Sequence, residues 1–227
     1  MVIKYHGDVL QGSDEWMEAR CGLLTASEVK FLLTDKTLKV ADNKDSRAHV
    51  FELLAQRITK YTEPSFFSHD MDRGTIDEVE ARILYSKNIS LVTETGFVTN
   101  DEYGFTLGYS PDGLVGEDGL IEIKSRKQKL QTETIFNNEM PTEFNRQIQT
   151  GLLVTKRKWC DFISYCGGMP LFVKRIVPCE KTQQAIIEAG FNLEANIKSK
   201  LETYNKNIQG SIITERIERN DYGEISV

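Results

Sequence analysis

The segment of residues 110–124, which reads SPDGLVGEDGLIEIK, restricts the fold more than any other part of the chain. Two clusters of turn residues, Pro-Asp-Gly and Gly-Glu-Asp-Gly, bound its short apolar runs. This spacing predicts a β-hairpin that leads into a strand over residues 120–124. Because successive side chains of a strand point to opposite faces, Glu122 and Lys124 share one face, and the isoleucines beside them occupy the other.

Asp112 stands in the first of these turns. A hairpin that folds back on itself brings Asp112 beside Glu122, so two carboxylates and the ammonium group of Lys124 would surround one point. Magnesium prefers oxygen ligands and keeps several waters, and the backbone carbonyl of Ile123 would be a further ligand. A bound ion acidifies water and neutralises charge on a phosphate, while Lys124 would orient or help deprotonate that water and stabilise the developing charge. The alternative is a solvated strand face beside an ordinary turn.

The remaining sequence predicts one α/β domain over residues 1–227. This length suits a single domain with a substantial core, and no internal repeat or linker divides it. The apolar residues Ile76, Val79, Ile83 and Leu84 are expected to face inward, and residues 35–46 predict a polar loop. A short helix that carries Trp16, Met17 and Arg20 is expected behind a Ser13 cap, and another after a capping box at 25–28. Further helices are expected over 48–58, 74–87, 142–155 and 182–204, and strands over 91–98, 104–109, 120–124, 159–166 and 171–177.

Composition is ordinary for a soluble globular protein, with 40% hydrophobic and 27% charged residues. No apolar run approaches the roughly 20 residues that span a bilayer, and the first residues, MVIKYHGDV, do not resemble a signal peptide. We therefore expect no membrane partner and a cytoplasmic location. The four scattered cysteines predict reduced thiols, because none forms a CxxC pair.

The net charge of −6 by itself argues weakly against a nucleic-acid partner, because phosphate binding needs positive potential. Bound divalent ions would offset buried carboxylates, however. Two local basic stretches remain, KSRKQK at residues 124–129 and KRK at residues 156–158. Each is compatible with DNA contact or with a solvated surface.

Four segments resemble a known family. Asp112 with Glu122-x-Lys124 resembles the core of the PD-(D/E)xK nuclease superfamily. The segments WMEARCGLLTASEV at 16–29, GTIDEVEAR at 74–82 and RQIQTGLLVT at 146–155 resemble, in family order, the lambda-type phage exonucleases, also called YqaJ-like viral recombinases. The resemblance implies a restriction-endonuclease-like core, with a central mixed β-sheet flanked by helices. The catalytic core would cover about residues 70–165, and a C-terminal helix and tail about 180–227.

The resemblance also implies a two-metal site. Glu78 matches a helical metal-binding glutamate that would hold the second Mg²⁺ jointly with Asp112. Glu122 and the Ile123 carbonyl would complete the first site, with Mn²⁺ as a substitute ion, and Lys124 matches the catalytic lysine. From its local pattern alone, Glu78 would be an exposed helix carboxylate like Glu80.

Arg20, Ser27, Ser110 and Gln147 match a pocket that holds a terminal 5′-phosphate in the resembled family. Arg20 can grip phosphate with a bidentate fork, and Ser27 follows the predicted Thr25 cap, where free N–H groups attract anions. A capping role alone is the alternative for Ser27. The pattern does not separate Gln147 from Gln149.

Met71 matches an apolar residue that wedges between terminal bases, although packing at a helix start is the simpler interpretation. The sequence departs from the family pattern at residues 125–127, Ser-Arg-Lys, where a small residue and then proline are expected. The connection to the helix of Gln147 is also shorter, and the C-terminal third matches only by element order.

The implied activity is 5′-to-3′ digestion of double-stranded DNA ends, which releases 5′-mononucleotides and leaves a 3′ overhang for a single-strand annealing protein. The resemblance also implies a homotrimer that encircles DNA. An endonuclease with the same core and a non-catalytic DNA-binding protein with the same fold are the alternatives. An iron–sulfur nuclease is disfavoured, because the cysteines are too scattered for a cluster.

Overall fold

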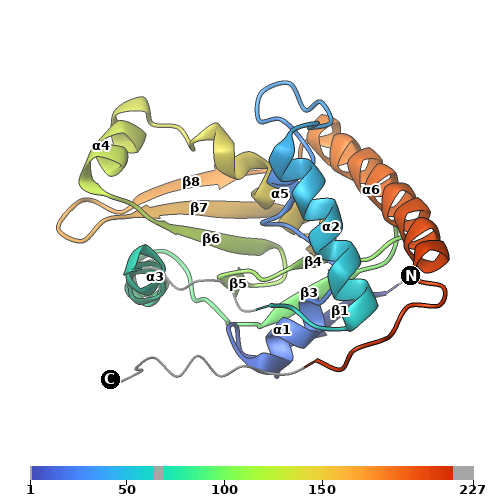
Figure 1. Cartoon of the computed structure of the whole chain (residues 1–227). Coiled ribbons are helices and arrows are strands. Elements are labelled where there is room, and N and C mark those ends of the chain that lie inside the picture. The colour runs from blue at the N-terminus through green and yellow to red at the C-terminus, as the bar shows by residue number, and fades with distance from the viewer. Residues whose placement is uncertain (1, 64–68, 217–227) are drawn as a thin grey trace, which may run out of the picture.

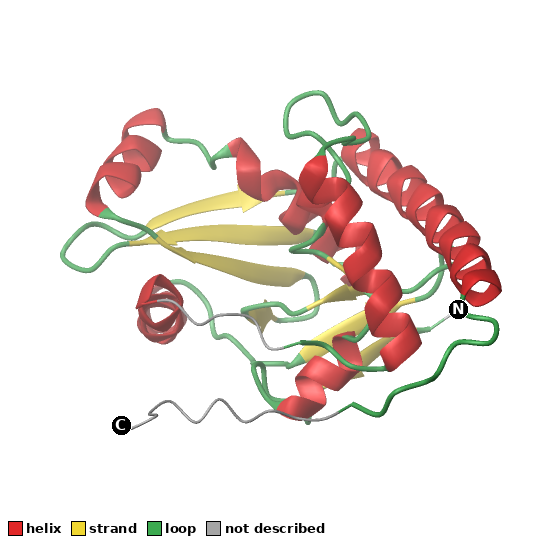
Figure 2. Cartoon of the chain, viewed as in Figure 1, coloured by secondary structure: helices red, strands yellow, loops and turns green. Residues whose placement is uncertain are grey.

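Two four-stranded sheets form the framework of the chain (Figures 1 and 2). The computed structural model describes residues 2–63 and 69–216, with side chains described from residue 73 onward in the second range. The first sheet has the order β1-β3-β4-β2 and the second β5-β6-β7-β8. The strands are β1 (Ile3–His6), β2 (Leu24–Thr25), β3 (Phe97–Asn100), β4 (Leu107–Tyr109), β5 (Gly113–Val115), β6 (Gly119–Ser125), β7 (Trp159–Tyr165) and β8 (Phe172–Ile176).

Each sheet is mixed. In the first, β1–β3 and β3–β4 are antiparallel and β2–β4 is parallel. In the second, β5–β6 and β7–β8 are antiparallel and β6–β7 is parallel. The chain passes from one sheet to the other between β4 and β5, through residues 110–112. The prediction of one central mixed sheet is thus refined to two, and Asp112 lies at the crossing.

Helices cover both faces of the second sheet. Figure 1 shows α2 and α6 side by side along one flank of the molecule, and contacts join both α2 and α5 to α6. On the other face, α3 contacts β6 and β7. The helices are α1 (Asp14–Arg20), α2 (Lys44–Thr59), α3 (His69–Asn88), α4 (Gln128–Asn137), α5 (Asn145–Thr155) and α6 (Glu180–Asn207), with 3₁₀ turns η1 (Val29–Phe31) and η2 (Thr142–Phe144).

Two apolar clusters lie on opposite faces of β6. The larger one joins Leu120 of β6 with Ile148 of α5 and residues of the first sheet, α2 and α6. The smaller one joins Ile121 and Ile123 with Tyr85 of α3. The period-two alternation predicted for β6 is therefore confirmed, and the face that carries Glu122 looks toward α5.

The side of α3 that the sequence predicts to be buried is exposed, and another side packs on the sheet. Ile76, Val79 and Ile83 are 66%, 48% and 55% exposed, whereas Ala81 and Tyr85 are fully buried. The helix packs on the sheet through small Ala81 and through Tyr85, whose hydroxyl donates to Asp161 at 2.7 Å. Leu84 is also exposed. The prediction that these four apolar residues face inward was wrong, and the inversion leaves Glu78 on a sheet-facing side.

Two other predictions need correction, and two elements were not predicted. The capping box at Thr25 opens only the single turn η1, because Ala26 N–H donates to Gly108 O at 2.8 Å and holds this segment to the first sheet. The carboxylate of Glu28 still accepts the Thr25 N–H at 2.9 Å. The strand expected over 91–98 is regular only from Phe97. Strand β1 and helix α4 were not predicted, and α4 arises from part of the basic stretch at 124–129.

Two boundaries also shift. Helix α2 begins at Lys44, four residues before the predicted start and inside the predicted polar loop, and β4 begins only at Leu107 of the strand expected over 104–109. The boundaries at α1 and α6 hold more closely. The Ser13 hydroxyl caps α1 by accepting from the N–H of Trp16, as the sequence predicts. Helix α6 extends the predicted range by a few residues at each end. Among the helices of the described residues, none combines the length and apolar character needed to cross a bilayer.

Candidate active site

The crossing between the sheets places Asp112 against β6. Asp112 is buried, and its Oδ2 accepts the backbone N–H of Ile123 at 2.5 Å. Since Asp112 immediately precedes β5, which pairs antiparallel with β6, the hairpin itself holds the carboxylate beside the middle of β6. Glu122, the residue before Ile123, is thereby a close neighbour.

Glu122 is the centre of a buried polar network. Its side chain is 1% exposed and receives three donors. Tyr109 O–H donates to Oε2 at 2.8 Å, Gln147 donates to Oε1 at 2.6 Å, and Lys124 Nζ lies 2.7 Å from Oε1. A buried carboxylate needs such partners, because removing it from water costs several kcal/mol. Glu122 and Lys124 lie on the same face of β6, as the alternation requires.

Gly151 explains how Tyr109 reaches Glu122. A Cβ atom on Gly151 would lie 2.7 Å from ring carbons of Tyr109, too close for any real contact. Only glycine therefore lets α5 approach β4 closely enough to bury Tyr109 beneath it. Sequence reasoning did not identify Tyr109 or Gly151, because neither carries a recognisable pattern of its own.

Helix α3 supplies a third carboxylate. Glu78 pairs with Arg82 one turn away at 2.7 Å, and Arg82 also pairs with Glu94. Burial raises the pKa of Glu78; Arg82 opposes that rise, and the negative charge of Glu122 adds to it. The exposed Glu80 shows no comparable contact among the described residues. Of these two glutamates, Glu78 is thus the one that α3 directs toward the β6 carboxylates.

The pKa shifts of the group have one physical origin, the crowding of negative charge in a buried place. Burial raises the pKa of Asp112 well above its ordinary value, and the charges of Glu122 and Glu78 raise it further. Burial alone would lower the pKa of Lys124, but the three carboxylates outweigh this effect and raise it. Shifts of this kind accumulate at functional sites, and the crowded negative charge that contributes to them favours the binding of a cation.

The donor chemistry fits Mg²⁺ or Mn²⁺, both of which prefer carboxylate and carbonyl oxygen. Within the described residues, however, no three acidic, histidine or cysteine side chains are grouped as a ready-made metal site. Lys124 and Gln147 engage Glu122, and Arg82 engages Glu78. These donors would have to turn away from the carboxylates when a cation binds.

A second cluster lies beside Ser110, two residues before Asp112. Trp16 Nε1–H donates to the Ser110 hydroxyl at 2.8 Å, and the Arg20 guanidinium stacks 3.9 Å from the Trp16 ring centroid. Arg20 donates to Thr25 Oγ1 at 3.2 Å, which in turn lies 3.3 Å from Ser27 Oγ. The parallel pairing of β2 with β4 brings these segments together. Trp16 was missed as a site residue, although its spacing from Arg20 places both on one helix face.

The two glutamines of α5 have different surroundings. Gln149 is buried, donates to Val177 O at 2.9 Å and accepts from Cys179 N–H at 2.8 Å. It therefore connects α5 to the start of α6. Gln147 instead contacts Glu122, and so it lies with the carboxylates. The side chain of Met71 lies outside the described residues.

The basic stretch at 156–158 is engaged in structural contacts. Lys156 pairs with Glu102 at 2.8 Å, and Lys158 pairs with Asp118 at 3.0 Å. Arg157 donates to the carbonyls of Gly116 and Gly119 and so closes the turn between β5 and β6. These contacts fit the interpretation of this stretch as a solvated surface, because its lysines are exposed and paired with acids.

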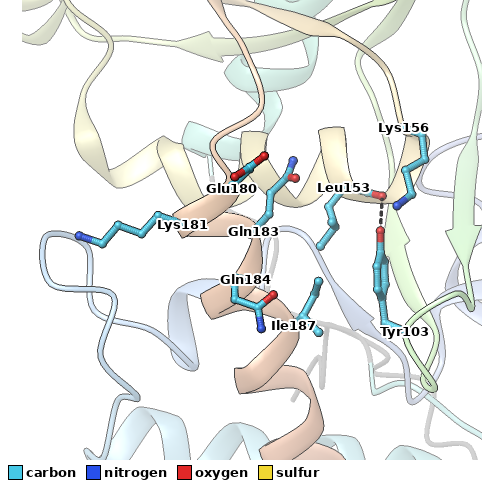
Figure 3. A pocket seen from close by; sticks show the side chains of 8 residues that line it. All are labelled: Tyr103, Leu153, Lys156, Glu180, Lys181, Gln183, Gln184 and Ile187. Atoms are coloured by element: carbon cyan, nitrogen blue, oxygen red, sulfur yellow. Dashed lines mark hydrogen bonds between the residues drawn. The ribbon is translucent and has the colours of Figure 1, made fainter.

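A pocket of about 560 Å³ between α5 and α6 holds none of these residues except the already paired Lys156 (Figure 3). Its wall includes Tyr103, whose hydroxyl donates to Leu153 O at 3.2 Å. The candidate catalytic carboxylates do not line this pocket. Tyr109 and Gln147 donate hydrogen bonds to Glu122.

Comparisons with known proteins agree with this geometry. A family model described as the YqaJ-like viral recombinase domain matches residues 15–158. An alkaline exonuclease (LHK-Exo) from Laribacter hongkongensis is 31% identical, with a TM-score of 0.77 over 88% of this chain and 100% of that chain. The structure of LHK-Exo in complex with dAMP gives 32% identity and a TM-score of 0.78 with the same coverage.

A phage related exonuclease from Haemophilus somnus 129PT is 12% identical, with a TM-score of 0.55 over 79% of this chain and 96% of that chain. This likeness shows a shared fold. Together with the LHK-Exo matches, it confirms the predicted fold class. The comparison with curated proteins finds no match.

Proposed function

Because the chain belongs to the YqaJ-like viral recombinase domain family, we propose that it is a magnesium-dependent exonuclease that digests double-stranded DNA in the 5′-to-3′ direction. It is a DNA exonuclease of the phage type, as its family and its relatives indicate. The observation that carries the finer proposal is the buried group of Asp112, Glu122 and Lys124 with Glu78 directed toward it.

We assign Glu78 and Asp112 to one Mg²⁺, and Asp112, Glu122 and the Ile123 carbonyl to the other. When bound, the two ions would acidify a water molecule and neutralise the scissile phosphate. The ammonium group of Lys124 lies 2.7 Å from Glu122, beside these carboxylates. Its proposed role is to orient the attacking water or to help deprotonate it, and to stabilise the developing negative charge. Tyr109 keeps Glu122 oriented through a hydrogen bond.

The Arg20 cluster is the proposed receptor for the terminal 5′-phosphate. Burial lowers the pKa of Arg20, but a guanidinium remains charged at any physiological pH. Stacking on Trp16 and the hydrogen bond to Thr25 hold its planar fork in place. The Ser27 and Ser110 hydroxyls lie in the same cluster. Gln147 is proposed as a phosphate contact nearer the scissile bond, because its amide already lies at Glu122.

Replacing Arg20 with glutamine tests whether the Arg20 cluster recognises the 5′-phosphate and so sets the direction of digestion. The unchanged protein should digest a linear duplex with a 5′-phosphate faster than one with a 5′-hydroxyl. In Arg20→Gln that preference should fall by roughly 10- to 100-fold, the value of one or two charge-assisted hydrogen bonds. Release of mononucleotides from end-labelled duplexes measures the rates.

The matched control is Arg47→Gln, which removes an exposed arginine paired only with Asp42 among the described residues. A covalently closed circle should stay intact, which separates exonuclease from endonuclease. Equal digestion from 3′ ends, or digestion in EDTA, would contradict the proposal. Binding of DNA without any cutting would favour the non-catalytic alternative.

We further propose that residues 1–227 form a single nuclease domain and that three copies form a ring around DNA. The single domain is supported by β6, which contributes to both apolar clusters. The homotrimer is supported by the exposed apolar side chains of Ile76, Val79 and Ile83 on α3. Their spacing is that of a helix packed against a second copy of the chain.

We also propose that a single-strand annealing protein receives the 3′-ended strand. The proposed location is the cytoplasm, which is that of the host cell if a phage encodes the chain.

Light scattering with size-exclusion chromatography tests the assembly. The unchanged protein should show three times the mass of one chain, and Ile83→Glu should shift the mass toward one chain at the same concentration. Val177→Glu places the same charge on another exposed apolar residue and should leave the mass unchanged. A single-chain mass for the unchanged protein would rule out the homotrimer without affecting the assignment of the carboxylates.

A further inference from the structure

A second pocket, of about 500 Å³, lies where α3, the end of β6, the start of α4 and the turn after β7 meet. Its wall carries four cationic side chains and a single acidic one, which is unusual in a chain of net charge −6. The basic stretch at 124–129 supplies most of this charge. The lining residues are Arg73, Asp77, Arg126, Lys127, Gln128, Lys129, Cys166 and Gly167.

Arg126 is the most deeply placed of the four cations. Its side chain is 10% exposed, and its Nη1 pairs with Glu143 at 3.0 Å. Its Nε–H is buried and has no hydrogen-bond partner among the described residues. Leaving a buried donor unsatisfied costs about 1–3 kcal/mol, so the Arg126 side chain is only partly satisfied by its contact with Glu143.

The pocket lies next along the chain from the catalytic group, because its lining residue Arg126 follows Lys124 by two positions. Lys124 and Arg126 both stack on the Phe144 ring, at 5.5 Å and 5.2 Å from its centroid. The N–H of Arg126 donates to Tyr165 O at 2.7 Å, so the strand pairing continues beyond Ser125. Residues two apart on a strand are separated by about 6.6 Å, which is close to the span of one nucleotide in an extended backbone.

The opposite wall is tied to the same strand. Ser125 O–H donates to Asp77 at 2.5 Å, and Arg73 Nε–H donates to Ser125 Oγ at 3.2 Å. Asp77 directly precedes Glu78. The two elements that carry catalytic groups, α3 and β6, therefore also carry the walls of the basic pocket.

Helix α4 is held firmly in place. Gln131 is fully buried and donates to the carbonyls of Ser164 and Pro170 at 3.0 and 2.9 Å, while its Oε1 accepts from the Ser164 hydroxyl at 2.5 Å. The helix begins at Gln128, in the pocket wall. Its positive end thus adds to the potential of the four side chains.

From this arrangement we propose that the basic pocket binds a backbone phosphate of the strand being cut, the first one on the 3′ side of the scissile phosphate. The inference rests on the proposed function, in which the Arg20 cluster takes the terminal phosphate and the carboxylates take the scissile one. In Figure 1, β5 and β6 lie between α1, which carries Arg20, and α4. The cut strand would thus contact three successive groups of the protein, and the basic pocket keeps the next nucleotide aligned for the following cut.

The test measures binding of a 5′-phosphorylated duplex by fluorescence anisotropy across a salt series. Ca²⁺ replaces Mg²⁺, after a check that the DNA stays intact. Arg126→Gln and Lys129→Gln should each weaken binding by roughly 3- to 10-fold and reduce the slope of log K against log salt by about one. Lys129 is exposed, so its variant avoids the folding risk at Arg126. Lys181→Gln, which removes an exposed lysine from the other pocket, should change neither quantity.

A single neutral methylphosphonate identifies the phosphate. Placed one position 3′ of the scissile phosphate in the cut strand, it should weaken binding by the unchanged protein and have no further effect on Arg126→Gln. An unchanged salt slope in both variants would overturn the inference, as would sensitivity only to a methylphosphonate in the opposite strand. In either case, a wild-type chain that still cuts DNA leaves the proposed function standing. If the unchanged chain neither binds nor cuts DNA, the proposed function itself fails.

Discussion

Replacing Lys124 with alanine will abolish DNA cutting, with a rate at least about a thousand times below that of the unchanged protein. The loss follows from its position, because its ammonium group lies 2.7 Å from Glu122 and no other described cation reaches that carboxylate. A preorganised charge of this kind is worth roughly 10²–10³ in rate for one donor, and here the same group also orients the attacking water. Time courses of mononucleotide release measure the effect.

The Lys124→Ala protein should still fold, with an unchanged circular dichroism spectrum. It should melt at a lower temperature, because Glu122 loses its cation and keeps Tyr109 and Gln147 as its partners among the described residues. Lys87→Ala, which removes an exposed lysine from the end of α3, should change neither rate nor melting. Cutting by Lys124→Ala at the normal rate would show that the proposed mechanism is wrong.

Asp112→Asn will also abolish cutting, and it should raise the melting temperature of the metal-free protein. The amide side chain keeps an oxygen that can accept the Ile123 N–H, but it removes one of three crowded negative charges. Relief of such strain at a functional site commonly stabilises a protein. For a chain of this size we expect an increase of roughly 2–6 °C in EDTA at pH 8.

The raised pKa of Asp112 also fixes how its contribution to the free energy of unfolding changes with pH. Since the folded pKa of Asp112 is raised, the folded protein retains a proton that the unfolded chain releases above about pH 4. The contribution of Asp112 to the free energy of unfolding is therefore present below about pH 4 and is lost as pH rises through the folded pKa. The amide of the Asp112→Asn variant cannot titrate, so the melting temperature of the variant minus that of the unchanged protein, both in EDTA, should increase from pH 4 to pH 9.

Added Mg²⁺ should reverse the order of the two melting temperatures, so that the unchanged protein melts above Asp112→Asn. A ligand that binds only the folded state raises its melting temperature, and the unchanged protein should gain more than Asp112→Asn. Asp118→Asn alters an exposed aspartate paired with Lys158 and should follow the unchanged protein in every condition. A lower melting temperature for Asp112→Asn in EDTA would contradict the charge-crowding argument, and full Mg²⁺ stabilisation of the variant would remove Asp112 from the metal site.

Much of the site is predictable from local pattern. The alternation of β6 places Glu122 and Lys124 together in any fold that keeps the strand. The turn at Asp112 places its carboxylate beside that strand, because Asp112 directly precedes β5 and β5 pairs antiparallel with β6. Before any coordinates are considered, the family segments predict a metal-binding role for Glu78 and a separate phosphate pocket at Arg20 and Ser110.

Other features depend on contacts between distant segments. Glu78 and Glu80 look alike in sequence, and only the packing of Ala81 and Tyr85 on β6–β7 decides which one turns inward. That same packing exposes Ile83, contrary to the periodicity of α3. Gln147 and Gln149 are separated only because the segment from β8 to α6 engages the latter.

The two basic stretches also look alike in sequence and differ in their tertiary contacts. Both are cationic in sequence, yet residues 156–158 close a turn and pair with acids, whereas residues 126–129 line a pocket beside the catalytic strand. The sequence by itself determined which side chains share a face of one strand or helix, because those relations follow from backbone geometry over a few residues. The tertiary structure alone decided which faces are buried and which groups meet, because these outcomes depend on the packing of segments far apart along the chain.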